Sequence, residues 1–213
     1  MKEIIVRVFT EGDLDDVVST HVSAFPGFLM TLLGPAFLRE YYRLVVDSPG
    51  GLLLVAECEG RVRGFAAGSM TPAQMYRQLK ERKLALLRAS AIHLALRPRL
   101  WPRVMENLKV SGERSAPTLN SEAYAELASI AVSPNLRGLG VGRLLLANFI
   151  EVAAAAGAAG VELTTDARDN DSVNRLYVAA GFGLVSSFQR RGNRAMNAYR
   201  ISFNKSPAHS APN

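Results

Sequence analysis

The stretch RGLGVGR, residues 137–143, decides the fold, because a strand-like segment precedes it and a helix-like segment follows it. Residues 126–132 (ELASIAV) alternate and end in β-branched residues, and Ser133-Pro134 stops them. Apolar residues then recur at helical spacing over residues 144–153. Glycine has no Cβ, so a ligand can approach the main chain, and the free N–H groups of a first helical turn bind phosphate oxygens. The pattern predicts a site for a pyrophosphate-bearing ligand.

The spacing of these glycines excludes two common phosphate-binding motifs. A P-loop ends in Lys-Ser or Lys-Thr, which do not follow here, and the dinucleotide fingerprint G-x-G-x-x-G has a different spacing. The order Arg-x-x-Gly-x-Gly resembles the acetyl-CoA signature Gln/Arg-x-x-Gly-x-Gly/Ala of the GNAT N-acetyltransferase superfamily. A turn that only caps a helix is the alternative interpretation. The resemblance implies that the CoA pyrophosphate is bound by Arg137, Gly138, Leu139, Gly140, Val141, Gly142 and Arg143.

A second block of sequence, residues 161–182, resembles the same family. Residues 161–166 form a strand-like run, and the family pattern Asn-x-x-Ala-x-x-x-Tyr-x-x-x-Gly-Phe/Tyr follows, with Val173 in place of the usual alanine. The order of strand, glycine turn, helix, strand and Asn/Tyr helix is more specific than either motif alone. The resemblance covers residues 120–203 well and residues 2–70 loosely. The residues that match the pattern are Asn170, Tyr177, Gly181 and Phe182.

The resemblance implies roles for three residues of this block. In the family, the asparagine contacts the pantetheine arm of CoA, which implies that role for Asn170, with Asn174 one turn later as a second candidate. The tyrosine hydroxyl lies near the CoA sulfur and protonates the leaving thiolate, so Tyr177 is expected to bind the cofactor and to act as the general acid. The alternative for Tyr177 is a core aromatic residue whose hydroxyl reaches the surface.

Acyl transfer to an amine also needs a base and a polarised thioester carbonyl. The resemblance implies that Glu126, which starts the strand leading to the glycine turn, removes the amine proton directly or through water. Glu122, four residues earlier, is the reserve base and a candidate acceptor contact. An exposed strand-end carboxylate is the alternative for Glu126. In the family this strand splays from its neighbour, so the backbones of Ile130, Ala131 and Val132 are expected to bind pantetheine, with the Val132 N–H polarising the acetyl carbonyl.

The acceptor side is expected at residues 25–35, because the loop between the first two helices lines that side in the family. Phe25 and Phe28 are the candidate acceptor-binding aromatic residues, although Phe25 also suits the core, and Tyr42 is a third candidate for the wall. His21 is within reach of this region, but a lone histidine on a helix more often has a structural role.

Length and composition favour a single domain over residues 1–203. The chain has 213 residues, of which 48% are hydrophobic and 21% are charged, which is enough to bury a sizeable core. No run of 18 apolar residues occurs and the N-terminus lacks a signal-peptide core, so we expect no transmembrane helix and a cytoplasmic protein. A single cysteine, Cys58, is expected to be a buried small hydrophobe. Three scattered histidines predict no metal site, and residues 204–213 are predicted to be disordered.

Strand and helix signals predict an α+β fold with helices on both faces of a mixed sheet. The resemblance implies the GNAT fold, a central, mostly antiparallel sheet of about six or seven strands flanked by helices. Strands are expected at residues 2–8, 52–58, 62–69, 184–190 and 195–203, and helices at residues 13–24 and 35–46.

Residues 72–114 form an insert longer than a hairpin connection needs. It holds ten Lys/Arg and three Asp/Glu, a net charge of +7 in a chain of +6. Its apolar middle predicts two helices broken near residues 97–99. Three interpretations stay open: a helix packed on the core, a lid that favours an anionic acceptor, and a surface that makes weak contact with anionic lipid. Nucleic acid is not expected as a partner, because aromatic residues are not interleaved with the basic ones.

The resemblance and the charge together imply an acetyl-CoA-dependent N-acetyltransferase that acts on the primary amine of a small acceptor by direct attack in a ternary complex. An anionic acceptor, an amino sugar or a nucleotide-linked amino sugar, is favoured, because the basic insert would repel a polycation such as an aminoglycoside. A peptide or protein α-amine is the rival acceptor, and a non-catalytic CoA-binding sensor is the rival from another class. The expected assembly is a monomer or a homodimer.

Overall fold

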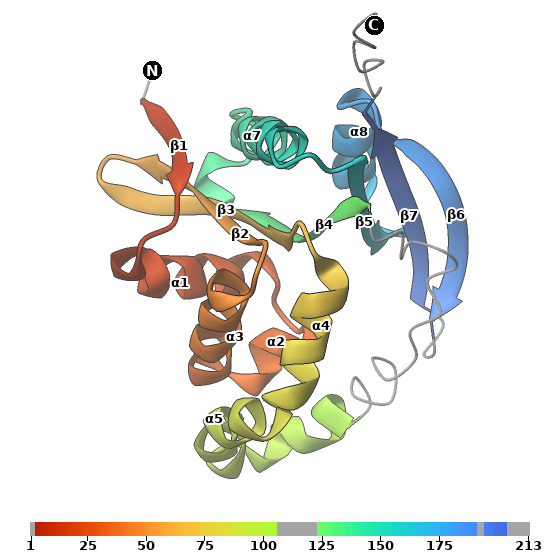
Figure 1. The fold of residues 1–213 in the computed structure, drawn as a ribbon. Coiled ribbons are helices and arrows are strands. Elements are labelled where there is room, and N and C mark those ends of the chain that lie inside the picture. Colours follow the sequence, from red (N-terminus) through yellow and green to blue (C-terminus); the bar gives the residue numbers. More distant parts are fainter. Residues whose placement is uncertain (1–2, 106–122, 191–193, 204–213) are drawn as a thin grey trace, which may run out of the picture.

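The computed structural model describes residues 3–105, 123–190 and 194–203. Its centre is a seven-stranded sheet in which neighbouring strands are antiparallel, except for one parallel pair, β4 and β5 (Figure 1). The strands, in the order in which they lie across the sheet, are β1 (Ile4–Val8), β2 (Gly51–Cys58), β3 (Arg61–Ser69), β4 (Tyr124–Val132), β5 (Gly160–Asp166), β7 (Arg194–Ser202) and β6 (Gly183–Arg190). The predicted mixed, mostly antiparallel sheet is therefore confirmed.

Helices cover both faces of this sheet. The α-helices are α1 (Leu14–Ala24), α2 (Leu29–Leu33), α3 (Pro35–Asp47), α4 (Pro72–Glu81), α5 (Lys83–Ala95), α7 (Val141–Ala155) and α8 (Asp171–Ala179). Short 3-10 turns are η1 (Glu11–Asp13), η2 (Pro98–Leu100) and η3 (Pro134–Leu136). In Figure 1, α7 and α8 lie on one face, α1, α3 and α4 lie on the other, and α5 lies farthest from the sheet. The α+β architecture predicted from the sequence is confirmed.

Each face of the sheet has its own hydrophobic core, because alternate side chains of a strand point to opposite faces. Leu145 and Phe149 of α7 pack in one core, and Tyr42 of α3 packs against Phe65 of β3 in the other. Tyr42 is fully buried, so it is a core residue and not the exposed acceptor wall that the sequence suggested, because α3 turns it toward the sheet. Cys58 is buried in the α7 core, as predicted.

The insert contains more helical pieces than the sequence suggested. The predicted break is confirmed, since α5 ends at Ala95 and the Pro98–Leu100 turn leads into a helical segment at residues 101–105. The single helix expected before that break is wrong, because the chain turns at Arg82 between α4 and α5, where φ is −87° and ψ is 10°. No proline or glycine marks this turn in the sequence. Residues 106–114 of the insert and the tail at 204–213 lie outside the described residues.

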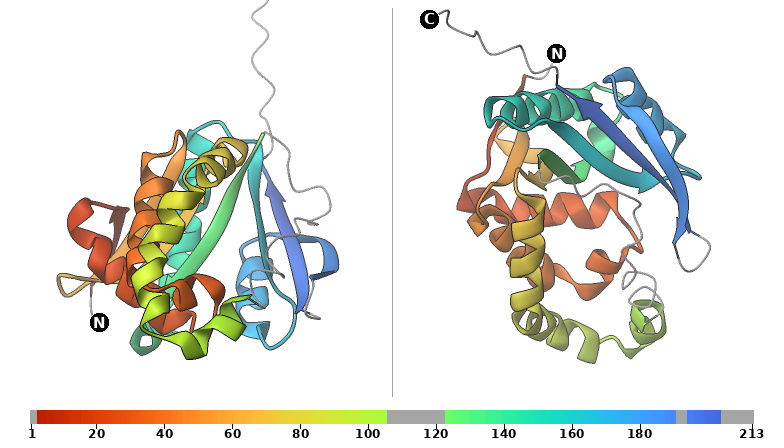
Figure 2. Two further views of the ribbon diagram at one scale, coloured as in Figure 1. Left: turned by 90° about the horizontal axis from the view of Figure 1, so that it is seen from below. Right: turned by 45° about the vertical axis from the view of Figure 1, so that its right-hand side comes forward.

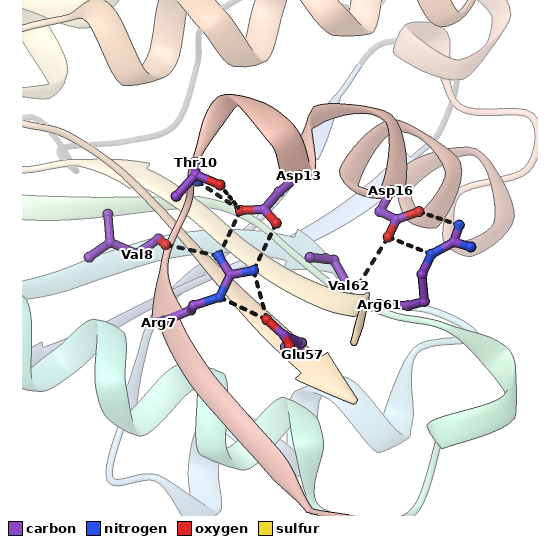
Figure 3. A network of polar contacts seen from close by, with 8 residues as sticks. All are labelled: Arg7, Val8, Thr10, Asp13, Asp16, Glu57, Arg61 and Val62. Atoms are coloured by element: carbon purple, nitrogen blue, oxygen red, sulfur yellow. Dashed lines mark hydrogen bonds and ion pairs between the residues drawn. The ribbon is translucent and has the colours of Figure 1, made fainter. Parts of the chain in front are cut away.

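An ionic network ties the start of α1 to three strands (Figure 3). Arg7 on β1 donates two hydrogen bonds to Asp13 at 2.7 and 2.8 Å and one to Glu57 on β2 at 2.9 Å. Asp16 of α1 accepts a hydrogen bond from Arg61 on β3 at 2.6 Å. The Arg7 guanidinium lowers the pKa of Asp13 to about 2, so this carboxylate stays ionised near neutral pH. The network fixes the start of α1 against the sheet.

Candidate active site

The sheet opens between β4 and β5, because the two strands pair over only part of their length. Parallel pairing joins Tyr124–Glu126 of β4 to Gly160–Glu162 of β5. Beyond these residues β4 stays paired with β3 as far as Val132, and β5 stays paired with β7 as far as Asp166. The two strands therefore diverge after Glu126 and Glu162, as the left view of Figure 2 shows. The predicted splay of this strand is confirmed.

The hydrogen bonds of β4 direct part of its backbone into this opening. The Ser133 N–H donates to the Arg63 C=O at 2.7 Å, so Ser133 and, two residues earlier, Ala131 occupy the positions that bond to β3. The backbone groups of Ile130 and Val132 consequently point away from β3, toward the gap that β5 leaves. Of the three strand residues expected to bind pantetheine, Ile130 and Val132 thus have the required backbone direction, and Ala131 does not.

The glycine turn lies at the end of β4, where α7 begins. Gly138 and Gly140 have φ angles of 78° and 81°, in the left-handed region, and Gly140 is the N-cap residue of α7. A Cβ added at either glycine would meet no atom within 4 Å, so the space beside the turn is open. The 3-10 turn Pro134–Leu136 lies between the strand and the glycines, and α7 starts after them, at Val141. The helix therefore does not follow the strand directly.

The first amides of α7 are available to an anion. The first N–H groups of an α-helix have no intrahelical acceptor, and at α7 the Leu144 N–H makes the first such bond, to the Gly140 C=O at 3.0 Å. The N–H groups of Val141, Gly142 and Arg143 precede it, and the helix dipole adds a partial positive charge at the same place. This end of α7 therefore has the properties that the sequence predicts for pyrophosphate binding.

Two arginines flank the turn. The side chains of Arg137 and Arg143 are exposed, and neither forms a hydrogen bond or ion pair with another residue of the described ranges. Leu139, between them, is 63% exposed. Gly142 lies beside α8, since a Cβ added there would come within 3.6 Å of Leu176. The first turn of α7 therefore lies beside the second half of α8.

The Asn174 amide is fully engaged inside the protein. Its Nδ2 donates to the Asp166 C=O and to the Asn170 C=O, each at 2.9 Å. Its Oδ1 accepts hydrogen bonds from the Asn197 side chain at 3.0 Å and from the Tyr199 hydroxyl at 2.9 Å. Because both N–H groups and both lone pairs are used, Asn174 holds α8 against β5 and β7. The expectation that Asn174 contacts pantetheine is corrected accordingly, since the side chain has no group left for a ligand.

Asn170 and Tyr177 occupy the two ends of α8. Asn170 is the N-cap residue, and its Nδ2 donates to Thr165 Oγ1 at 2.8 Å and to the Asp166 C=O at 3.3 Å. Tyr177 is 4% exposed, and its ring packs against Phe182 and Tyr199 at centroid distances of 5.9 Å. Burial raises the pKa of Tyr177, so its hydroxyl keeps a proton at neutral pH. A protonated hydroxyl is what a general acid needs, although the packing also suits a core aromatic residue.

Glu126 lies where β4 and β5 begin to diverge. A bulge at Ala128 changes the alternation of β4, so Leu127 packs in the α7 core and Glu126 faces the opposite side of the sheet. There the Tyr76 hydroxyl of α4 donates to the Glu126 carboxylate at 2.5 Å. Burial raises the pKa of nearby Tyr41, and the charge of Glu126 adds to that rise. Glu126 is therefore an oriented carboxylate at the apex of the opening and not an unconstrained strand-end residue.

Glu162 is a second carboxylate at the apex, and no motif in the sequence singled it out. It is in register with Glu126 across the parallel pair and with Arg200 across β5 and β7. Arg200 donates to Glu162 at 3.1 Å and lies over the Tyr124 ring, 4.5 Å from its centroid. Burial, reinforced by the charge of Glu126, raises the pKa of Glu162 to about 7 in spite of Arg200. The available signal was a single glutamate inside the apolar run of β5.

Aromatic and charged residues border the other end of the opening. Arg194 of β7 forms two hydrogen bonds with Asp166, the last residue of β5, at 2.5 and 2.7 Å. The Arg194 guanidinium also lies over the Phe28 ring, 4.9 Å from its centroid. Phe28 is 39% exposed and contacts the Phe25 ring at 5.5 Å. The loop after α1 therefore meets the C-terminal strands, and Phe28 is the more accessible of the two candidate acceptor-binding aromatics.

His21 belongs to the core. It is 3% exposed, its Nδ1 lies 2.6 Å from the Tyr42 hydroxyl, and its ring contacts Phe25 and Phe65 at 4.9 and 6.2 Å. Burial lowers the pKa of His21 to about 4, so the ring is neutral at physiological pH. The structural role expected of a lone helical histidine is confirmed.

Three further expectations concern residues or groups beyond this cluster. Glu122, the reserve base and candidate acceptor contact, lies outside the described residues. Across residues 3–105, 123–190 and 194–203, no three His, Cys, Asp or Glu side chains gather in a way that would hold a metal ion. No helix in those same ranges is long and apolar enough to cross a membrane.

Both a family profile and solved structures relate this chain to acetyltransferases. The profile of the acetyltransferase (GNAT) family matches residues 15–182, whereas no curated protein matches the chain. Among solved structures, the N-acetyltransferase from Staphylococcus aureus Mu50 is 17% identical with a TM-score of 0.61, and 94% of this chain covers 98% of that one. The ribosomal-protein-S18-alanine N-acetyltransferase from Escherichia coli is 14% identical with a TM-score of 0.59, at 99% and 100% coverage. The ribosomal-protein-alanine N-acetyltransferase from Brucella melitensis is 20% identical with a TM-score of 0.59, at 93% and 99% coverage. At these identities the likeness establishes the fold.

Proposed function

Since the chain belongs to the acetyltransferase (GNAT) family and is an acyltransferase, we propose that it moves an acetyl group from acetyl-CoA to the primary amine of a small acceptor. The amine attacks the thioester directly, while both substrates are bound in a ternary complex. The opening between β4 and β5 carries this proposal. It brings together a glycine turn, backbone groups directed into the gap and an oriented carboxylate at the apex.

The groups around the opening fit acetyl-CoA, which supplies an activated thioester with a thiolate leaving group. The amides at the start of α7 and the exposed Arg137 and Arg143 side chains would hold the pyrophosphate. The backbones of Ile130 and Val132 would pair with the pantetheine arm, as an added strand does. We assign Asn170 to this arm because its Oδ1 makes no capping bond to α8, whereas the Asn174 Oδ1 already accepts two hydrogen bonds.

Three residues have separate roles in the transfer. Glu126, oriented by Tyr76, accepts the amine proton as the new C–N bond forms. The Val132 N–H donates to the carbonyl oxygen as negative charge develops on it, and removing one such donor typically costs roughly 100-fold in rate. Tyr177 donates its hydroxyl proton to the sulfur as the C–S bond breaks.

We assign the acceptor to small anionic amines, with an amino sugar or nucleotide-linked amino sugar as the first candidate. Residues 72–105 carry eight Lys/Arg and one Glu. This segment begins with α4, whose Tyr76 contacts Glu126, so its positive potential starts beside the apex. Such a potential concentrates an anionic acceptor and repels a polycationic one.

Calorimetric titration with acetyl-CoA and a thiol-release assay test this proposal together. The amines in the assay are nucleotide-linked amino sugars, amino sugar phosphates, peptides with a free α-amine and an aminoglycoside. We expect micromolar acetyl-CoA binding and the fastest thiol release with the anionic amino sugars. Gly140→Glu should abolish binding. The matched control is Gly157→Glu, at the other end of α7, since Gly157 also has a positive φ of 79° and open space for a Cβ.

Each outcome separates the alternatives. Equal loss of binding in both glycine variants, or no binding by the wild type, would contradict the proposed cofactor site. Binding without thiol release from any amine would favour the CoA sensor. Release with peptides alone would move the acceptor to the α-amine class while leaving the acetyl-CoA site in place.

A further inference from the structure

The outward side of α5 is apolar and exposed. The helix packs mainly against α3, and its inward side carries Leu86 and Ser90, which are 7% and 1% exposed. In Figure 1, α5 lies at the margin of the molecule farthest from the sheet. The exposed apolar residues on the outward side, and just beyond its end, are Leu84 (69%), Leu87 (41%), Ile92 (76%) and Leu96 (76%).

The composition of this side is unusual for a helix that meets only water. Residues 84–96 contain no Asp or Glu, and Arg88 is the one Lys or Arg among them. A surface helix of a globular protein normally has a polar face opposite its buried stripe, whereas a helix that is apolar all round is normally covered. The outward side of α5 is therefore suited to a second contact.

Trp101 continues the apolar surface past the end of α5. Its side chain is 56% exposed, and its Nε1 donates to the Leu94 C=O at 2.9 Å, which fixes the indole against the helix. Met105, one helical turn later, is 55% exposed. Tryptophan is enriched at membrane interfaces because it has a large apolar body and a polar edge. We call Leu84, Leu87, Ile92, Leu96, Trp101 and Met105 together the α5 face.

Cations lie before the α5 face and within its second half. Arg82 and Lys83 precede it, and Arg97, Arg99 and Arg103 lie in its second half, all of them exposed. Residues 72–105 carry eight Lys/Arg against one Glu, so more than the whole net charge of the chain, +6, is gathered here. In a twofold contact with a second copy, the same patch meets itself, so cationic ends would face each other. The charge therefore favours an anionic partner over self-association.

We propose that the α5 face docks on the surface of an anionic lipid bilayer, with α5 lying in the plane of the interface. Thirteen helical residues extend over about 20 Å, which is shorter than the roughly 30 Å hydrocarbon core. The apolar side chains enter the boundary of the acyl chains while the flanking Lys and Arg reach the headgroups. A disordered apolar medium suits this face because the six side chains that define it are apolar, and the one polar atom among them that donates, Trp101 Nε1, already bonds to the Leu94 C=O. This contact is independent of acetyl transfer.

Trp101 provides a direct test, because it is the single tryptophan of the chain. The full-length protein is titrated with vesicles of phosphatidylcholine that contain about 30% phosphatidylglycerol, and with vesicles of phosphatidylcholine alone. We expect a saturable blue shift of the Trp101 emission with the anionic vesicles and little change with the neutral ones. Raising the salt to about 0.5 M should weaken the binding severalfold, because it screens the attraction between the cations and the headgroups.

Substitutions on exposed residues complete the test. The double variant Ile92→Glu/Leu96→Glu should bind anionic vesicles about tenfold or more weakly, because two carboxylates would have to enter the interface. Val178→Glu is the matched control, since Val178 is an apolar residue on α8 with 58% exposure. Circular dichroism and the acetyl-CoA titration verify that both variants keep the fold.

Three results would overturn the proposal. The first is vesicle binding by the double variant as tight as that of the wild type, and the second is a wild type that binds neither vesicle. The third is a concentration-dependent dimer in sedimentation experiments that the double variant abolishes, because the α5 face would then belong to a second copy of the chain.

Discussion

Glu162 and His21 are buried ionisable side chains with opposite effects on stability. Burial raises the pKa of Glu162 from 4.5 to about 7 and lowers that of His21 from 6.5 to about 4. The fold favours a protonated Glu162, so the contribution of this side chain to the free energy of unfolding is complete below pH 4.5 and is lost as the pH rises toward 7. It also favours a neutral His21, whose contribution is complete above pH 6.5 and is lost as the pH falls toward 4. Between pH 4.5 and 6.5 the two trends oppose each other.

Single substitutions should therefore separate the two slopes. Relative to the wild type, the free energy of unfolding of Glu162→Gln should rise with pH between 4.5 and 6.5, because only the His21 trend remains. That of His21→Gln should fall over the same interval. Each trend amounts to roughly 3 kcal/mol when complete. Urea unfolding at several pH values measures both slopes, and two variants that run parallel to the wild type would contradict the assignment.

Tyr177→Phe separates the two interpretations of this residue. If the hydroxyl protonates the leaving thiolate, turnover should fall by roughly 100-fold while the dissociation constant of acetyl-CoA stays within a factor of two, because proton transfer acts in the transition state. The buried ring, which packs against Phe182, is preserved by the substitution. Turnover and calorimetry on the same preparation give both values. Unchanged turnover would leave Tyr177 as a core aromatic residue.

Some residues of the candidate site could be predicted from the sequence and others could not. The spacing of the glycine motif singled out Gly140, and the resemblance to the family singled out Glu126. The structure gives Gly140 a left-handed backbone and makes Glu126 an oriented carboxylate. Glu162 could not, because its raised pKa depends on β4 and β7, which are distant in sequence. Asn174 looked like a ligand contact for the same reason, since its four partners become visible only when α8 meets β5 and β7.

At the scale of elements, the position of α8 depends on the Asn174 amide. Asn174→Ala removes four hydrogen bonds to the helix and to β5 and β7, so we expect a loss of roughly 2 kcal/mol in the free energy of unfolding. Asn148→Ala is the control, because the Asn148 amide donates to the Leu144 C=O of its own helix and, among the described residues, to no other element. Thermal unfolding of the two variants measures the difference. Equal stability would mean that Asn174 does not anchor α8.

Local signals located some elements and not others. The start of α7 and the break after α5 could be predicted, because glycines and a proline mark them. The turn at Arg82 has no such mark, and it forms where α5 leaves the direction of α4 to pack against α3. The bulge at Ala128 is equally invisible in the sequence, although it decides which face Glu126 reaches. Both features come from packing and register, which local propensity does not determine.

At the scale of the whole molecule, the site exists because two half-sheets meet at a short parallel pair. The resemblance to a family predicted that β4 splays, whereas composition and periodicity had no bearing on it. The extent of the opening depends on pairings over long sequence distances, from β4 to β3 on one side and from β5 to β7 on the other. One link across the open end joins the helical layer to the C-terminal strands, through Phe28 and Arg194.

Removing that link should loosen the loop after α1 without affecting the cofactor end. Arg194→Leu eliminates the ion pair with Asp166 and the stacking on Phe28, so amide hydrogen exchange over residues 25–33 should accelerate severalfold. Acetyl-CoA affinity should change by less than about a factor of two, because the glycine turn lies between β4 and α7, whereas Arg194 and Asp166 belong to β7 and β5. Arg39→Leu is the control, since Arg39 is similarly exposed and pairs with Asp15 away from the opening. Acceleration in both variants, or in neither, would show that the Phe28–Arg194–Asp166 contact does not hold the two halves together.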